Sequence, residues 1–519
     1  MKKLIKLLTF IVSISMLSAA FSACSDEKNE STNSGDVSAD QSGNNDVSGS
    51  DDPSTWALKS PISGTFIQPW LYGSWSSRDW EREIQVWDEM GIEYVIMGDT
   101  ASYDLSTGKL TTAYPTSIEG ATCSGDVVTK LFEVCKENGR KLFIGIGNTP
   151  AGWPYLDFGN KDNFEVFREV CKVYASIAED VYNHYYPEYS DVFAGFYFVP
   201  EMYNSSMFDA DDTRQTYVDG MAYGLNIIFE KLDELNPDLP FIFSPYLNIF
   251  GGSWVSKSSE NIGKFWTEFL SQVNFRDGDI LCPQDSVGAG GMDLEHLDEY
   301  TAMYKKATEE CGKEIRFWSN CETFIQPKDE FFSLSDGVSY WGSASVARLV
   351  EQFNTVGKYA EVIVTFAFPH YQSPVNNVDG FYETFKDYLR NGKLETNAPT
   401  APNKFRTNKT TMTINQEQRE VLTVYWSGMY DDFGIWKVNI YKNGELLTYR
   451  YPTRRENGMA MYPNSFYDAD YDFENETATY TIEVFDCAGN VSERVDFTVT
   501  PGSVPNNVTL DKTYTGPTD

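Results

Sequence analysis

The chain has few histidines and few basic residues, and its cysteines follow no recognisable spacing. Each of these shortages argues against a class of function. Its 519 residues include three histidines, His184, His296 and His370, which do not cluster, so no histidine-rich metal site is expected. The 41 basic and 76 acidic residues leave a net charge of −35, which repels phosphate backbones and argues against nucleic acid as a partner. Of eight cysteines, seven remain once Cys24 is set aside, an odd number without metal-site or disulfide spacing. We therefore expect no metal and no cofactor.

Long apolar runs are also scarce, and the one at the N-terminus indicates where in the cell the protein is sent. Residues 7–21 are apolar but too few for a spanning helix, and lysines precede them. The run ends in Phe-Ser-Ala-Cys at Cys24, which resembles a bacterial lipobox. We predict a lipoprotein signal peptide over residues 1–24, with lipidation of Cys24 and an extracellular, membrane-anchored protein. Residues 25–56 are rich in Ser, Asp, Asn and Gly and predict a disordered linker.

After the linker, the hydrophobic pattern alternates between short runs typical of strands and longer stretches with helical spacing. The predicted strands span residues 64–70, 94–98, 141–147, 194–199, 240–246, 279–283, 314–318 and 362–368. The predicted helices span residues 78–90, 127–138, 164–183, 213–235, 262–273, 297–311, 344–359 and 381–389. Strict alternation predicts a parallel sheet, and this many units in one domain predict a closed barrel.

The competing architecture is an open, doubly wound sheet. Such sheets often carry a glycine-rich phosphate-binding turn after the first strand, where this chain has Gln68-Pro69-Trp70. The fold class is therefore predicted as α/β, a (β/α)8 TIM barrel over residues 57–395, followed by a small all-β domain.

Carboxylates at predicted strand ends are the main candidates for chemistry, because such barrels carry their active sites at the C-terminal ends of the strands. Glu201 follows the apolar run 194–199, and Glu322 lies shortly after the run 314–318. Cleavage of a glycosidic bond needs two carboxyl groups, so this pair is the candidate catalytic pair. Other polar and aromatic residues near strand ends are candidate substrate-binding residues, since aromatic rings stack on sugars. They are Gln68, Trp70, Asp99, Asn148, Trp153, Tyr197, Tyr246, Asn248, Asp285, Trp318, His370 and Tyr371.

Two segments carry a family resemblance, Ile-Ser-Gly-Thr-Phe-Ile-Gln at residues 62–68 and Tyr-Phe-Val-Pro-Glu ending at Glu201. The chain resembles a family of uncharacterised bacterial glycosidase-like barrels, and its strand-end carboxylates are placed as in the large retaining glycosidase clan. The resemblance implies Glu201 as acid/base and Glu322 as nucleophile. Pro200 stands where that clan has Asn. Asp285 or Asp99 therefore stays open as the second carboxylate, and a wider pair would mean inversion.

The barrel is followed by a proline-containing linker, residues 396–403, after which the hydrophobic period changes to two. Residues 404–501 resemble a fibronectin type III β-sandwich through Trp426-Ser427 and the segment 480–490. Its role is predicted as a spacer or barrel-packing unit, with carbohydrate binding as the alternative. Residues 502–519 are predicted to be a disordered tail.

Two functions follow from these features. The first is an extracellular glycoside hydrolase acting on a poly- or oligosaccharide. The second is a non-catalytic carbohydrate-binding or surface-scaffold lipoprotein that kept the barrel without the chemistry. Carbohydrate and the membrane are the expected partners in both.

Overall fold

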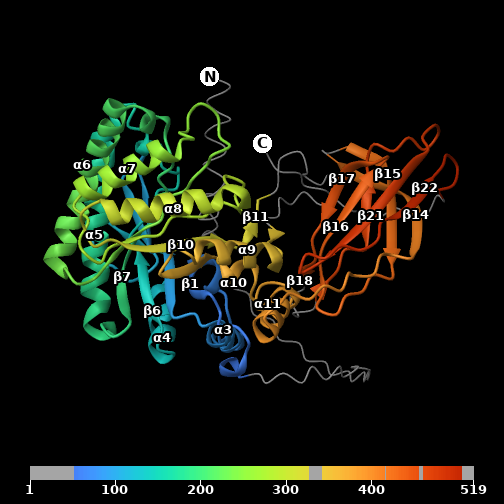
Figure 1. Cartoon of the computed structure of the whole chain (residues 1–519), viewed down its shortest axis with the longest axis horizontal. Coiled ribbons are helices and arrows are strands. Elements are labelled where there is room, and N and C mark those ends of the chain that lie inside the picture. The colour runs from blue at the N-terminus through green and yellow to red at the C-terminus, as the bar shows by residue number, and fades with distance from the viewer. Residues whose placement is uncertain (1–51, 327–341, 415–416, 455–459, 505–519) are drawn as a thin grey trace.

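The computed structural model describes residues 52–326, 342–414, 417–454 and 460–504. The predicted signal peptide with Cys24, the linker up to residue 51 and the tail from residue 505 lie outside the described residues. Residues Pro53–Thr55 form a short 3-10 helix, so regular structure begins slightly before the predicted boundary at residue 57. A barrel and a β-domain lie side by side (Figure 1).

The first domain is a closed barrel whose strands are hydrogen-bonded in the order β1-β13-β10-β9-β8-β7-β6-β2. All neighbouring pairs are parallel, which confirms the predicted fold class. The strands are β1 Ile62–Ile67, β2 Tyr94–Asp99, β6 Lys141–Gly145, β7 Phe193–Phe198, β8 Phe241–Phe243, β9 Ile280–Leu281, β10 Arg316–Glu322 and β13 Val362–Phe366.

Helices surround the barrel and follow its strands in the chain. The longer ones are α3 Ser77–Met90, α4 Val128–Glu137, α5 Asn163–Tyr189, α6 Asp211–Leu235, α7 Ser259–Gln272, α8 Leu294–Glu310, α9 Val346–Val356 and α11 Gly380–Asn391. The sequence dictates α3 clearly, because Ser76 and Asp79 form a reciprocal capping box and Gly91 ends the helix in the left-handed conformation. No helix in the described part of the chain is long and apolar enough to cross a membrane.

A cluster of apolar side chains that point inward from the strands fills the barrel interior. Alternation along β10 turns Trp318 inward beside Phe143 and Tyr94, at ring-centroid distances of 5.7 and 4.9 Å. A second, larger cluster fills the space between strands and helices. Strand β8 is shorter than the predicted run 240–246, so Tyr246 and Asn248 lie on the loop that follows it.

Several short helices and strands follow the ends of the barrel strands. They are α2 Pro69–Tyr72 and α10 Phe368–Tyr371, the small sheet of β3 Ala101–Asp104, β4 Lys109–Thr112 and β5 Thr122–Cys123, and the pair β11 Phe324–Ile325 with β12 Gly342–Ser343. The sequence patterns did not predict the small sheet or the pair, because these strands are too short to show a period.

The second domain is all-β, as predicted. One sheet pairs β14 Lys404–Ile414, β15 Glu417–Ser427 and β20 Ser465–Asp468, and the other pairs β17 Glu445–Arg450, β16 Ile435–Lys442, β21 Ala478–Asp486 and β22 Val495–Val499. A small pair is formed by β18 Thr453–Arg454 and β19 Ala460–Met461. The two larger sheets are antiparallel and share one core that includes Trp426 and Tyr480, which makes the domain a sandwich. Its fibronectin type III character stays a prediction.

Candidate active site

Glu201 lies just beyond β7, at the C-terminal mouth of the barrel. Tyr197 and Val199 face the barrel interior, and the charge of Glu201 acts on Tyr197, which indicates that Glu201 lies near them. The side chain is half-buried, and burial is the main cause that raises its pKa to about 7, opposed by a hydrogen bond from Gln284. Glu201 is therefore a carboxyl group that can hold a proton near neutral pH and still reach solvent.

Glu322 is the last residue of β10 and shares the inward face with Trp318 and Asn320. It is only 1% exposed. Its pKa is raised well above the usual range, first by burial, then by the negative charge of Asp285 and, more weakly, by that of Glu201. Since the charge of Glu201 contributes, the two predicted catalytic carboxylates share the mouth.

A glycine-rich loop, residues 286–291, covers Glu322. The Ala289 N–H donates to Oε2 of Glu322 at 2.6 Å. Gly288 packs so tightly that a Cβ there would lie 2.8 Å from the Glu322 Cβ and 3.0 Å from its Oε2. Any larger residue at Gly288 would push the loop away from the carboxylate. Glu201 is thus open to the mouth, whereas Glu322 is covered.

Asp285, the open alternative for the second carboxylate, is bound to the backbone around Glu322. Its Oδ1 accepts the N–H groups of Glu322 and Val287, both at 3.2 Å, and its Oδ2 accepts the Gln352 amide. Burial raises its pKa, while these donors lower it. Because among the described residues Asp285 receives three donors and the Glu322 carboxylate one, we assign the negative charge of this pair to Asp285 and the proton to Glu322.

The side of the mouth formed by β1 and β13 is neutral. His370 accepts the Gln68 N–H on Nε2 at 3.3 Å, and its ring meets that of Trp70 edge-on at 5.0 Å. Burial lowers the pKa of His370 to about 3, so the imidazole is uncharged near neutral pH. Gln68, Trp70 and His370 are all partly exposed and can meet a ligand.

Three further predicted residues also lie at the mouth. Tyr246 is raised in pKa by burial and by both Glu322 and Glu201, and Tyr371 by burial and Glu322, so both rings lie near the carboxylates. Asp99, at the end of β2, has a pKa raised to about 6 by burial. In the barrel, β6 lies between the strand of Asp99 and β7, whereas β1 and β13 lie between it and β10. Asp99 is therefore closer in strand order to Glu201 than to Glu322.

The remaining predicted binding residues are buried in this structure, and their contact with a sugar stays a prediction. They are Asn148, Trp153, Tyr197, Asn248 and Trp318, none more than 8% exposed. Asn148 accepts the Trp153 indole N–H at 3.0 Å, and Asn248 accepts the Phe250 N–H at 3.0 Å, so both amides fix loops. Tyr197 and Trp318 fill the barrel core, because they lie one or two inward layers beneath the mouth.

Three residues that contact the two carboxylates or their backbone were not predicted from the sequence. Gln284 bonds Glu201, while Arg348 and Gln352 reach the Glu322 backbone from α9. A signal was present, since Arg348 and Gln352 are four residues apart, on one helix face, and Gln352 interrupts an apolar stripe that includes Leu349 and Phe353.

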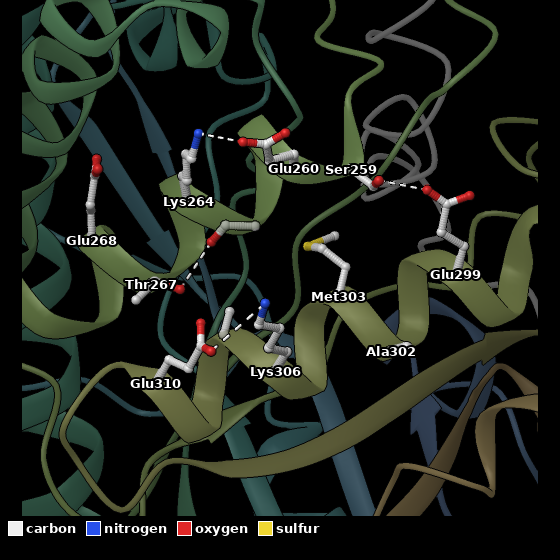
Figure 2. Close-up of a pocket in the computed structure, with 12 residues that line it drawn as sticks. Ser259, Glu260, Lys264, Thr267, Glu268, Glu299, Ala302, Met303, Lys306 and Glu310 are labelled. Atoms are coloured by element: carbon white, nitrogen blue, oxygen red, sulfur yellow. Dashed lines mark hydrogen bonds and ion pairs between the residues drawn. The ribbon is translucent and has the colours of Figure 1, made fainter.

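A groove of about 700 Å³ lies elsewhere, between α7 and α8 on the outside of the barrel (Figure 2). Its charged lining is largely paired, with Lys264 on Glu260 at 2.6 Å and the Ser259 hydroxyl on Glu299 at 2.5 Å. None of the mouth residues lines it. Its solvated ion pairs are typical of neighbouring surface helices and bring together no reactive carboxyl pair.

The comparison with protein families gives one match. Residues 62–378 match the family described as Domain of unknown function (DUF4434). The chain belongs to this family. The match spans the barrel from β1 to the segment before α11, and it includes every mouth residue described above. No curated protein matches this DUF4434 chain in sequence.

Solved structures similar to the DUF4434 chain include a xylanase, a β-galactosidase and a β-glucosidase. The intracellular xylanase TsXylA of Thermoanaerobacterium saccharolyticum shares 12% identity with a TM-score of 0.37, over 62% of this chain and 90% of that one. The β-galactosidase of Marinomonas ef1 shares 12% with a TM-score of 0.35, over 59% and 54%. The β-glucosidase of Thermotoga maritima shares 9% with a TM-score of 0.33, over 59% and 88%.

Proposed function

We propose that the protein is an extracellular glycoside hydrolase, held at the bacterial membrane by a lipid on Cys24, that cleaves O-glycosyl bonds of a poly- or oligosaccharide. The observation that carries the proposal is Glu201, a half-buried carboxyl group at the barrel mouth with a pKa raised to about 7, whose charge also contributes to the raised pKa of Glu322. Partly exposed rings of Trp70, Tyr246 and Tyr371 supply the apolar faces on which sugars stack.

In the proposed reaction Glu201 protonates the departing glycosidic oxygen, since its raised pKa keeps the proton available near neutral pH. Glu322 first releases its proton to solvent and then attacks the anomeric carbon as a carboxylate, and Glu201 afterwards takes a proton from the water that releases the sugar. The Ala289 N–H and the nearby charge of Arg348 favour the ionised form of Glu322. The loop over Glu322 has to open for this step. Activity should therefore require one protonated and one ionised carboxyl group and show a bell-shaped pH dependence.

The burial of Glu322 favours the second candidate function, carbohydrate binding without catalysis. At 1% exposure its carboxylate meets the Ala289 backbone rather than open space. If the loop stays closed, Glu201 and the mouth rings form a sugar-binding site in which Glu322 takes no part.

The deciding experiment is hydrolysis of plant, bacterial and fungal glycans by the chain starting at Ser54, beside Glu201→Gln and Glu322→Gln. Loss of about 10²- to 10⁴-fold in kcat is expected in each variant, as is usual for acid–base and nucleophilic groups. NMR of the first anomer released tests retention against inversion.

The matched control is Glu83→Gln. Glu83 is also a buried carboxyl group with a pKa raised to about 7, but it lies on α3, and its oxygens accept Trp87 and Ser373 rather than a mouth residue. Its variant should keep full activity. A wild-type protein that binds a glycan and releases nothing would establish the binding function instead.

A further inference from the structure

The sandwich supplies hydrogen bonds that helix α9 of the barrel cannot make for itself. The first N–H groups of a helix have no partner within it. In α9 the Val346 N–H donates to the carbonyl of Cys487 at 2.8 Å, and the Ala347 N–H to that of Ala488 at 3.3 Å. Ser345 accepts the next N–H, that of Arg348, at 3.4 Å. A turn of the second domain thus completes the N-terminus of a barrel helix.

An apolar contact extends the same interface. Trp436 and Cys487 of the sandwich pack with Val378 and Phe381 of the barrel, and all four are buried. The Trp436 indole N–H donates to the Ser343 carbonyl at 2.7 Å.

This contact leads directly toward the site. Ser343 lies in β12 and pairs with Phe324 of β11, two residues after Glu322. Figure 1 shows α9, α11 and β11 on the side of the barrel that faces the sandwich. The sandwich therefore touches the segment that carries Glu322 on two routes, through β12 and through α9.

Helix α9 in turn holds the backbone of Glu322. Arg348 donates through Nη2 to the carbonyls of Glu322 and Phe324, at 2.8 and 2.7 Å. Gln352 donates through Nε2 to the Glu322 carbonyl at 3.2 Å and to Asp285. An arginine in the first turn of a helix opposes the helix dipole, so the favourable contacts with these carbonyls offset an unfavourable location.

We infer that the sandwich is a positioning element for Glu322: it anchors the start of α9 and β12, and Arg348 and Gln352 pass that anchoring to the carboxylate-bearing strand. Arg348 and Gln352 are positioning residues, since they bind the backbone of Glu322 and not its reacting atoms. The kinetic part of this inference rests on the proposed function, whereas the structural part does not.

The test compares two tryptophans of the sandwich in the full chain. Trp436→Phe keeps a ring in the interface and removes the N–H bond to Ser343. Trp426→Phe is the matched control, because Trp426 is equally buried and its N–H contacts the Met429 sulfur inside the sandwich. We expect Trp436→Phe to lower kcat by about two- to tenfold, the range of one neutral hydrogen bond, with KM unchanged and the acid limb of the pH profile shifted. Trp426→Phe should change none of these.

Hydrogen exchange read by mass spectrometry decides the structural part without a substrate. In Trp436→Phe the peptides covering residues 316–326 and 342–356 should exchange faster than in wild type, and in Trp426→Phe they should not. If wild type hydrolyses no glycan, the proposed function fails and this measurement still decides the inference. Faster exchange confined to residues 342–356, or equal changes in both variants, would overturn it.

A double-mutant cycle sharpens the result. If Arg348 carries the coupling, Trp436→Phe should add little to the exchange change already caused by Arg348→Lys. Fully additive changes would show that the sandwich does not act through α9, and the inference would fall.

Discussion

Glu83 on α3 and Glu201 at the barrel mouth are two carboxyl groups with the same raised pKa of about 7 and very different surroundings. Glu83 is fully buried, and its two oxygens accept the Trp87 indole N–H, at 2.8 Å, and the Ser373 hydroxyl. Glu201 is half-buried, and in the described part of the chain its side-chain partner is Gln284.

A raised pKa by itself therefore does not mark a reactive group. Burial raises both values, because removing a carboxyl group from water disfavours its charged form. At Glu83 the proton is held among satisfied partners and has no open space to reach. At Glu201 the same proton faces a mouth lined by aromatic rings. Availability, decided by the surrounding loops, separates a structural acid from a candidate catalyst.

Stability against pH should show the structural role of Glu83. The folded protein keeps this proton up to about pH 7, and the unfolded chain releases it near its ordinary pKa of 4.5. The folded state then binds more protons in this window, so the Glu83 contribution to the free energy of unfolding declines as pH rises through it. Glu83→Gln should match wild type near pH 4 and be more stable at pH 8 by up to about 3 kcal/mol. Urea unfolding at both pH values measures this.

The same measurement on Glu201→Gln sharpens the comparison. Its gain at pH 8 should have the same sign and be smaller, since solvent reaches the half-buried side chain. Equal gains would mean that the two carboxyl groups are buried alike and that Glu201 is no more accessible than Glu83.

Asp285→Asn tests the charge shared beneath Glu322. Removing the negative charge of Asp285 should lower the pKa of Glu322 and move the acid limb of the pH–rate profile to lower pH. We expect kcat to fall by about tenfold as well, because the Asp285 contact that orients the Glu322 backbone is weakened. Gln352 has an unpartnered Oε1 that can turn to accept the new amide. An acid limb that does not move would separate Asp285 from the titration of Glu322.

His370→Gln should have the smallest effect. The imidazole is uncharged above pH 4 because its pKa is about 3, and a glutamine oxygen can accept the Gln68 N–H in its place. The pH–rate profile above pH 5 should keep its shape, with kcat/KM changed by about threefold or less, the effect of one neutral hydrogen bond. A shifted limb would make His370 the titrating group and reverse the description of this side of the mouth as neutral.

Much of the fold could be predicted from the sequence, because the alternating periods and helix caps act between near neighbours in the chain. The capping box at Ser76 and the apolar strand before Glu201 are read from a few consecutive residues. The same alternation along β10 puts Trp318 on the same face of the strand as Glu322, four residues later. Trp318 lies inside the barrel.

The eight-stranded barrel, the all-β second domain and the places of Glu201 and Glu322 near strand ends all follow from local sequence patterns. Only the tertiary structure decided that residues 286–291 cover Glu322, that Arg348 and Gln352 hold its backbone, and that the sandwich completes α9. These contacts join segments 24 or more residues apart in the chain: Arg348 reaches Phe324 over 24, and Val346 reaches Cys487 over more than a hundred. A residue pattern records which face of an element is buried, and it does not record which distant element covers that face once the barrel has closed.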